Sequence, residues 1–189
     1  MNTSTFVAKL AESPVRIPWP GGPSLKQYFS FPESMVYYTA KNPSTSKYYS
    51  KIIQSCKYYF QKQPILAVTK IDNENIICSD EKCICSHCYN CCVKIDINKI
   101  SNKFWLTNTF SLEASDSRNF ISMISPKIYR CEIVYLYFID KNIIYDDFKM
   151  LGSHAKQIYL EYVQIKYKNG STVMLEQILE VIPNVVKFY

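Results

Sequence analysis

The chain has 189 residues, of which 48% are hydrophobic and 20% charged, an ordinary composition for a folded protein of one medium domain or two small ones. Its net charge of +6 is not gathered into a basic run, which does not favour a nucleic-acid-binding surface. No apolar stretch is long enough for a secretory signal or a membrane span. We therefore expect an intracellular protein, in the cytoplasm, the nucleus or both, with no membrane partner.

Composition and hydrophobic periodicity divide the chain into four regions. Prolines and a Gly-Gly pair dominate the first region, helical periodicity the second, and strand periodicity most of the rest. The regions are an irregular lead-in (1–27), a helical region (28–62), a β-hairpin with a cysteine-rich insertion (63–102, insertion 78–92) and alternating strands and helices (103–189). The predicted fold class is therefore mixed, between α+β and α/β.

Two helices are predicted in the helical region. Ser30 and Glu33 have the spacing of a capping box, with Pro32 in the first turn. The helix that they open should run to about Ala40 and be stopped by Asn42-Pro43, because a proline forces the preceding residue out of the α region. A second helix is predicted from about residue 46 to residue 60, where apolar side chains recur along one broad stripe.

Six of the eight cysteines lie within residues 78–92. Strands predicted at 65–71 and 93–97 would place them near the tip of a hairpin. A structural zinc ion needs four ligands in a tetrahedron, whereas the spacing lacks the last cysteine of a bacterial ferredoxin run. No cofactor is required, and a structural zinc ion is the one candidate. The alternatives are a loop of free thiols without metal, and redox or disulfide chemistry. The candidate ligands are Cys78, Cys83, Cys88 and Cys91, with His87, Cys85 or Cys92 as substitutes.

From residue 103 onward, four short apolar segments recur at intervals of 24 to 30 residues. They are residues 104–106, 134–136, 158–160 and 186–188. A candidate helix lies in each gap, at 117–128, 146–151 and 175–181, and Asn169-Gly170 predicts a two-residue turn. Such alternation is typical of leucine-rich-repeat solenoids, in which each unit buries its apolar face against the next. The alternative is an ordinary α/β domain with coincidental spacing.

The helical region opens on Phe31-Pro32-Glu33, continues with apolar residues such as Met35 and closes on SCKYYF, residues 55–60. These features resemble an F-box. Residues 126–189 are similar to the leucine-rich-repeat-like part of the F-box proteins that are greatly expanded in nematodes. The resemblance covers about 31–60 and 103–189, and it does not account for the cysteine-rich insertion.

The resemblance implies a non-catalytic adaptor. F-box proteins are substrate receptors of cullin-RING (SCF) ubiquitin ligases: the F-box docks on the Skp linker protein, and the C-terminal domain holds a protein target. The expected linker-binding residues are Phe31, Pro32, Val36, Ile52 and Cys56, with packing inside the helical region as the alternative for Ile52 and Cys56. The expected target-binding residues on the strands are Tyr135, Tyr137, Tyr159, Glu161 and Tyr162.

Catalysis is not expected, because the sequence has no nucleophile elbow, phosphate loop or His-Glu-x-x-His motif. His154 is predicted to be a surface or capping residue. Two other functions remain open: a protein-interaction domain outside ubiquitination, and a zinc-dependent nucleic-acid binder. Only Lys82 is basic within residues 78–92, which speaks against the second.

Overall fold

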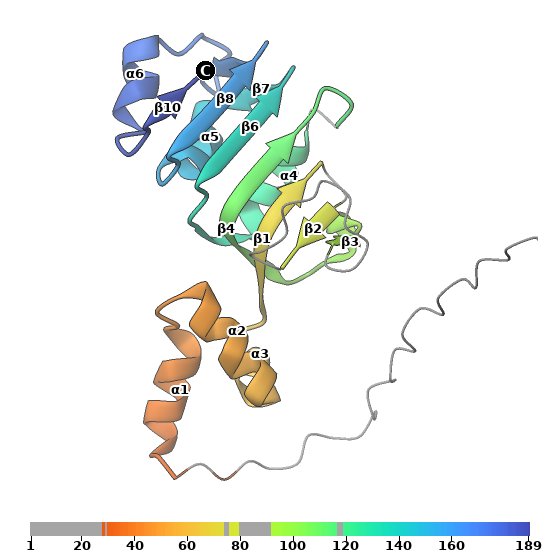
Figure 1. The fold of residues 1–189 in the computed structure, drawn as a ribbon, viewed down its shortest axis with the longest axis vertical. Helices are drawn as coiled ribbons and strands as arrows, with labels where there is room; N and C mark the ends of the chain where they lie inside the picture. Colours follow the sequence, from red (N-terminus) through yellow and green to blue (C-terminus); the bar gives the residue numbers. More distant parts are fainter. Residues whose placement is uncertain (1–27, 29, 74–75, 80–91, 117–118) are drawn as a thin grey trace, which may run out of the picture.

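The computed structural model describes residues 28, 30–73, 76–79, 92–116 and 119–189. They form a mixed fold of helices and a mostly parallel sheet (Figure 1), as the sequence predicts. Three helices come first and make up what we call the helical lobe. They are α1 (Glu33–Lys41), α2 (Ser46–Ser55) and α3 (Lys57–Lys62). The predicted lead-in, 1–27, lies outside the described residues.

Helix α1 begins differently from the prediction. Its N-cap is Pro32, and no side chain caps the first turn, so the capping box expected from Ser30 is wrong. Instead the carbonyl of Pro32 accepts the N–H groups of Met35 and Val36, and proline is tolerated at this position because the helix does not need its N–H. The helix ends at Lys41 with Asn42 as its C-cap, one residue beyond the predicted end and before the proline that was expected to stop it.

The second predicted helix is broken in two. Helix α2 starts after Thr45, whose hydroxyl accepts the N–H of Tyr48 at 3.1 Å. At Cys56 the backbone is extended, with φ −155° and ψ 126°, and α3 begins one residue later. The break redirects α3 so that it packs against both α1 and α2.

The described residues from 65 to 189 form what we call the sheet lobe. Its large sheet has the order β10-β8-β6-β4-β1-β2-β3, with β5 paired to β4 beside this path. Pairing is parallel from β10 to β1 and antiparallel from β1 to β3. The strands are β1 (Ile65–Asp72), β2 (Ile76–Cys78), β3 (Cys92–Lys94), β4 (Lys103–Leu112), β5 (Ile128–Cys131), β6 (Tyr135–Ile139), β8 (Gln157–Glu161) and β10 (Lys187–Phe188).

The cysteine-rich segment is enclosed by different strands from those predicted. The strand at 65–71 is present as β1, but its antiparallel neighbour is β2, which was not predicted. The second predicted strand, 93–97, is only β3, followed by a 3-10 turn at Ile97–Lys99. The hairpin at the ends of the cysteine-rich segment therefore consists of β2 and β3, and residues 80–91 lie outside the described residues.

Two consecutive units of the sheet lobe share one backbone pattern. Strands β6 and β8 are each followed directly by a residue in the left-handed region, Asp140 (φ 51°) and Tyr162 (φ 53°). Each is followed by a short strand, β7 (Asn142–Ile144) or β9 (Gln164–Lys166), and these two strands pair in parallel. The N–H of Asp140 donates to the carbonyl of Glu161 at 2.8 Å, so one unit stacks directly on the next.

Helices follow the strands near the predicted positions. Helix α4 (Phe120–Ile124) is shorter than predicted and passes into a 3-10 turn at Ser125–Lys127, since Pro126 lacks the N–H that a longer helix would use. Helices α5 (Tyr145–Gly152) and α6 (Leu175–Glu180) match their predictions closely.

The turn at Asn169-Gly170 is present but has three residues. Gly170 has φ +85°, and its N–H donates to the carbonyl of Tyr167. The Tyr167 N–H donates in turn to the carbonyl of Ser171. This combination is typical of a three-residue hairpin loop that closes with a glycine bulge.

The helices of the sheet lobe lie on one face of the sheet. Figure 1 shows α4 and α5 behind the strands, and their apolar residues share one core with alternate strand residues. Representative core residues are Phe110, Phe120, Leu136, Phe138, Phe148, Leu151 and Ile158. The intervening strand residues point to the opposite side, which we call the open face.

Candidate functional site

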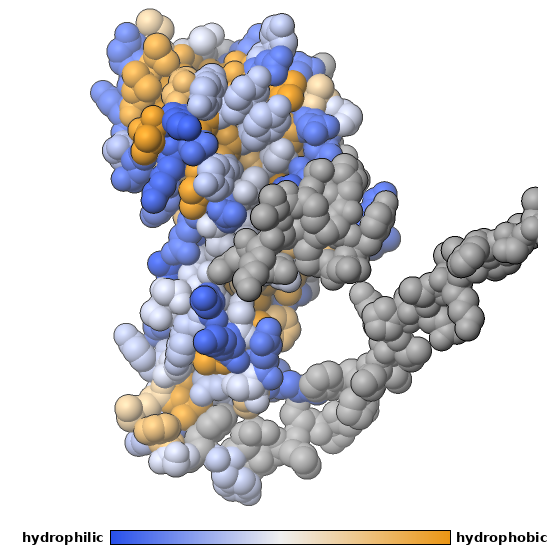
Figure 2. All heavy atoms as spheres, in the orientation of Figure 1, coloured by the Kyte–Doolittle hydropathy of each residue, from blue (hydrophilic) through white to orange (hydrophobic). Residues whose placement is uncertain are grey.

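Large apolar side chains are exposed along α1. Met35 and Tyr38 lie three positions apart on α1, a spacing that places residues on one side of a helix, and Phe31 comes just before the N-cap residue Pro32. The exposed fractions of Phe31, Met35 and Tyr38 are 65%, 56% and 67%. We call these three residues the α1 stripe. Figure 2 shows hydrophobic residues at the surface of the helical lobe. Exposed apolar residues on one side of a helix are the anchors by which an amphipathic helix binds in a partner's groove.

Two of the five predicted linker-binding residues are exposed, and the other three are buried or half-buried. Phe31 and Pro32 are exposed. Val36 is only 4% exposed and packs inside the helical lobe, so it offers little surface to a partner. Ile52 packs against the cluster around Tyr49, and Cys56 is half-buried between α2 and α3. The docking role of all five residues stays a prediction.

Met35 and Tyr38 had not been singled out as docking residues. The signal was available in the sequence, because the two are large apolar residues three positions apart, a helical spacing. It was ambiguous, because Val36 and Ala40 form an equally apolar pair on the same helix. Only the packing of the lobe, which buries Val36 and Ala40, decides which side faces outward.

A buried joint connects the helical lobe to the sheet lobe. It consists of Tyr49 on α2, Ile65 on β1 and Trp105 on β4. The Tyr49 hydroxyl donates to the carbonyl of Gln63 at 2.5 Å and accepts the N–H of Ile65 at 3.2 Å. Burial raises the pKa of Tyr49, so the phenol stays protonated and available as a donor.

Trp105 is also contacted by two charged residues of the sheet lobe, Arg130 and Glu132. Its indole N–H donates to Oε2 of Glu132 at 2.9 Å, and the guanidinium of Arg130 lies 4.8 Å from its ring centre. Arg130 and Glu132 are themselves joined by an ion pair at 2.7 Å. Tyr49 and Trp105 lie with their ring centres 6.2 Å apart. The joint thus holds one face of α2 against the ends of β1 and β4.

Tyrosines form a row across the open face. Tyr137 on β6 is in register with Tyr159 on β8, and their rings stack with centres 4.6 Å apart. The ring of Tyr189, which follows β10, lies 6.3 Å beyond. The Tyr159 hydroxyl donates to Oε2 of Glu161 at 2.8 Å, and this hydrogen bond raises the pKa of Tyr159. We call Tyr137, Tyr159 and Tyr189 the tyrosine row.

The predicted target-binding residues are therefore mostly neighbours. Tyr135, Tyr137, Tyr159 and Glu161 occupy alternate positions of β6 and β8, on the open face. Tyr162 lies apart from them, in the turn after β8, and is 81% exposed. Tyr189 had not been predicted, since its place beside Tyr159 depends on the register of β10.

The candidate zinc ligands are only partly described. Cys78 is buried at the end of β2, whereas Cys83, Cys88 and Cys91 lie outside the described residues, as do Cys85 and His87. Cys92 begins β3 directly opposite Cys78. In the part of the chain that the structure describes, no group of three or more potential metal ligands gathers.

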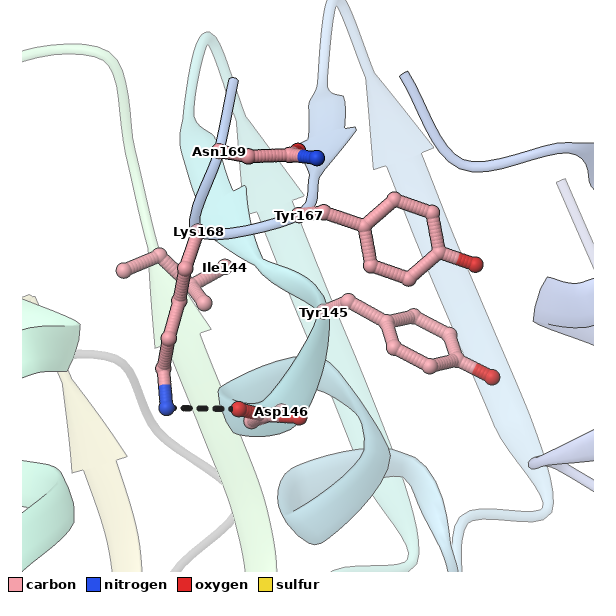
Figure 3. Close-up of a pocket in the computed structure, with 6 residues that line it drawn as sticks. All are labelled: Ile144, Tyr145, Asp146, Tyr167, Lys168 and Asn169. Carbon is pink, nitrogen blue, oxygen red and sulfur yellow. Dashed lines mark ion pairs between the residues drawn. The ribbon is translucent and has the colours of Figure 1, made fainter. Parts of the chain in front are cut away.

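A hollow of about 330 Å³ lies where α5 begins beside the end of β9 (Figure 3). Tyr145 and Tyr167 form one side, with ring centres 5.2 Å apart. Lys168 reaches Asp146 at 2.8 Å, which raises the pKa of the lysine. The lysine charge is thereby paired, and no lining residue is a nucleophile next to a base. We assign no catalytic role to this hollow.

His154 is exposed and lies 3.0 Å from the hydroxyl of the adjacent Ser153. Asp146 and Asp147 occupy the first turn of α5, where negative charge is favourable. The exposed position of His154 agrees with its prediction as a surface or capping residue. Within the described ranges, no helix has the length and apolar character needed to cross a bilayer.

Comparisons with known proteins assign no relatives to this chain. No family model matches it, and no curated protein or solved structure matches it either. Its functional interpretation therefore rests on the surfaces described above.

Proposed function

We propose that this chain is a non-catalytic adaptor that docks the Skp linker of a cullin-RING ubiquitin ligase and presents a protein target. The observation that carries the proposal is the α1 stripe, an exposed apolar surface on a helical lobe whose segment SCKYYF and opening Phe31-Pro32 resemble an F-box. Three large apolar side chains, one just before α1 and two on it, are costly to leave in water. Docking in a partner's groove would remove that cost.

The separation of the two surfaces supports an adaptor in particular. The α1 stripe belongs to the helical lobe, and the tyrosine row belongs to the sheet lobe on the other side of the Tyr49–Trp105 joint. Because the buried joint links the lobes, a linker and a target could be held at the same time in a defined relative position. That is the mechanical task of a substrate receptor.

We further propose that the sheet lobe is an irregular, leucine-rich-repeat-like solenoid. Consecutive parallel strands are neighbours in the sheet, helices cover one face only, and the β6–β7 and β8–β9 units share their left-handed turn. Stacked units of this kind present a continuous strand surface for binding. The target would lie on the open face, against the tyrosine row with Tyr135 and Glu161 beside it.

Binding to a purified Skp-type linker tests the adaptor role. We expect the full chain to bind the linker in titration calorimetry, and the double variant Phe31→Glu, Tyr38→Glu to bind at least about 100-fold more weakly, because both substitutions remove apolar anchors of the α1 stripe. Val36 is not suitable for this test, since its burial would make a polar substitution unfold the lobe.

Tyr48→Glu is the matched control. Tyr48 is an exposed aromatic residue of the same lobe, but it lies on α2, outside the α1 stripe. This variant should bind like the wild type. A folded wild-type chain that does not bind the linker would overturn the adaptor role and leave a protein-interaction domain outside ubiquitination. Equal weakening by Tyr48→Glu would show that the contact is not the α1 stripe.

A further inference from the structure

Strands β1, β6 and β8 of the large sheet are each followed directly by a residue in the left-handed region. These residues are Asn73 (φ 56°), Asp140 (φ 51°) and Tyr162 (φ 53°). Asparagine and aspartate tolerate this conformation because their short polar side chains can hydrogen-bond locally, whereas a bulky residue is strained there. The turn after β8 therefore holds a residue type that its backbone conformation does not favour.

Burial does not compensate for the strain at Tyr162. The side chain is 81% exposed, so its ring adds little to the core of the sheet lobe. Strained backbone is often found at binding sites, where the side chain is needed for something other than stability. The fold alone thus gives no reason for a tyrosine at this position.

The phenol of Tyr162 lies close to the tyrosine row. The pKa of Tyr159 is raised first by its hydrogen bond to Glu161, and to a smaller extent by the nearby phenols of Tyr137 and Tyr162. Tyr137 and Tyr159 are also stacked on each other. Tyr162 therefore extends an aromatic surface that surrounds one carboxylate, that of Glu161.

The charge of Glu161 is not neutralised within the described part of the chain. One carboxylate oxygen accepts the Tyr159 hydroxyl at 2.8 Å, and no described residue forms an ion pair with it. Asp140, exposed at the same end of the parallel strands (Figure 1), adds a second negative charge. Lys141 in the turn after β6 is 2% exposed, and its ammonium donates to the carbonyl of Asp116 at 3.0 Å. This part of the open face is therefore complementary to a cation.

We propose that Glu161, Tyr162 and the stacked pair of Tyr137 and Tyr159 bind an arginine side chain on a basic segment of the protein target. The guanidinium pairs with Glu161 and lies against the exposed ring of Tyr162. Arginine fits better than lysine because its planar group stacks on aromatic rings and binds a carboxylate through two parallel N–H groups. The inference rests on the proposed function, since it names the chemistry of the target that the open face receives. We call these four residues the arginine site.

Fluorescence anisotropy with the full chain at low ionic strength tests the arginine site. The probe is a labelled peptide of alternating arginine and glycine, compared with peptides in which lysine or citrulline replaces arginine. We expect the lysine peptide to bind about tenfold more weakly than the arginine peptide. The citrulline peptide should bind about 100-fold more weakly, because citrulline keeps the shape of arginine without its charge.

Two substitutions in the arginine site have different expected effects on stability. Glu161→Gln should weaken binding of the arginine peptide by at least about tenfold, whereas Glu176→Gln, at an exposed position on α6, should leave it unchanged. Tyr162→Asn should also weaken binding, yet raise the urea midpoint of unfolding, because asparagine tolerates the left-handed conformation. A substitution that merely damaged the fold would lower both quantities.

Several results would overturn the arginine site. They are no binding of the arginine peptide, equal binding of the citrulline peptide, unchanged binding in Glu161→Gln or Tyr162→Asn, and an equal loss in the Glu176→Gln control. A lower urea midpoint for Tyr162→Asn would also count against it, since the tyrosine would then serve the fold. Titration of the same protein with the Skp-type linker separates the two proposals: linker binding without peptide binding removes the arginine site alone, and peptide binding without linker binding removes the adaptor role alone.

Discussion

The helical lobe and the sheet lobe bury apolar side chains to different extents. In the helical lobe, the buried hydrophobic residues are Val36, Ala40 and Tyr49, while large apolar residues such as Phe31 and Tyr38 remain exposed. The sheet lobe has one continuous core that runs from β1 to the segment after α6. A lobe with so small a core is marginal by itself, and part of its stability must come from the joint with the sheet.

Because of this difference, residues that stabilise the fold and residues that could bind a partner should lie in different parts of the chain. Substitutions in the sheet lobe core should unfold the protein, whereas substitutions on the α1 stripe should change binding and leave folding intact. The residues at the joint should lie between these extremes, because they couple the two lobes without belonging to the main core.

The largest effect is expected for Phe138→Ala in the sheet lobe. Phe138 is fully buried on β6, with its ring centre 5.7 Å from that of Phe110. Removing a buried phenyl ring leaves a cavity and costs about 3–5 kcal/mol. Urea unfolding followed by circular dichroism measures the loss.

Phe31→Ala is the matched substitution in the helical lobe. Its ring is largely exposed, so the free energy of unfolding should change by no more than about 0.5 kcal/mol. If Phe31→Ala destabilised the protein as much as Phe138→Ala, the α1 stripe would be part of a core, and its role as a docking surface would be wrong.

An intermediate effect is expected for Tyr49→Phe at the joint. The substitution keeps the ring but removes the hydroxyl that bonds to Gln63 and Ile65, at a cost of about 1 kcal/mol. Hydrogen exchange should speed up in α1 and α2 while β6 and β8 keep their protection.

Tyr48→Phe provides the comparison for Tyr49→Phe, since it removes a hydroxyl from the adjacent, exposed residue. It should leave exchange unchanged throughout. Faster exchange in both lobes of Tyr49→Phe would mean that the joint is integral to the sheet lobe, and the division into two lobes would not hold.

The smallest effect concerns Cys131 on β5. Burial, helped by the Glu132 carboxylate, raises the pKa of its thiol to about 11. Because the raised pKa favours the protonated form, the associated stability is complete below the ordinary thiol pKa and is lost as the pH rises through about 11. Alkylation at Cys131 should therefore be slow at pH 8 and rise about tenfold per pH unit up to pH 11.

Mass spectrometry of alkylated peptides measures this rate site by site. The signal of Cys131 is read in its own peptide, so the other cysteines do not interfere. A rate at Cys131 that levels off near pH 9 would show that the β5 side of the sheet lobe is open to solvent.

Much of the fold could be predicted from local patterns. The strands at β1, β4, β6 and β8 contain strongly apolar segments, and α5 and α6 have helical periodicity with acidic residues in the first turn. Such signals depend only on neighbouring residues. The predicted order of helices, strands, and then alternating strands and helices follows from them.

The predictions are wrong where tertiary contacts, rather than neighbouring residues in the sequence, determine the local structure. Strand β2 has three residues, too few to show a period. The break at Cys56 interrupts an apolar stripe that continues on both sides, so the pattern alone favours one long helix. Helix α1 has apolar residues on two sides, and only packing in the lobe buries Val36 and exposes Met35. The same limit explains why Val36 was expected at the docking surface.

The order of the parallel strands has a consequence for how the chain folds. Thr109 pairs with Tyr135, Tyr135 with Gln157 and Gln157 with Lys187, at sequence separations of 26, 22 and 30 residues. The pairing of β1 with β4 joins Ile65 to Lys103, 38 residues apart, and the entropy of closing this loop is greater by about 0.5 kcal/mol than for the shortest. The strand pair with the shortest sequence separation, β6 with β8, can thus form first, and the other strands can then add to it one at a time. The contact of Tyr49 with Ile65 at the joint closes a loop of 16 residues, so its entropic cost is lower than that of any of these strand pairs.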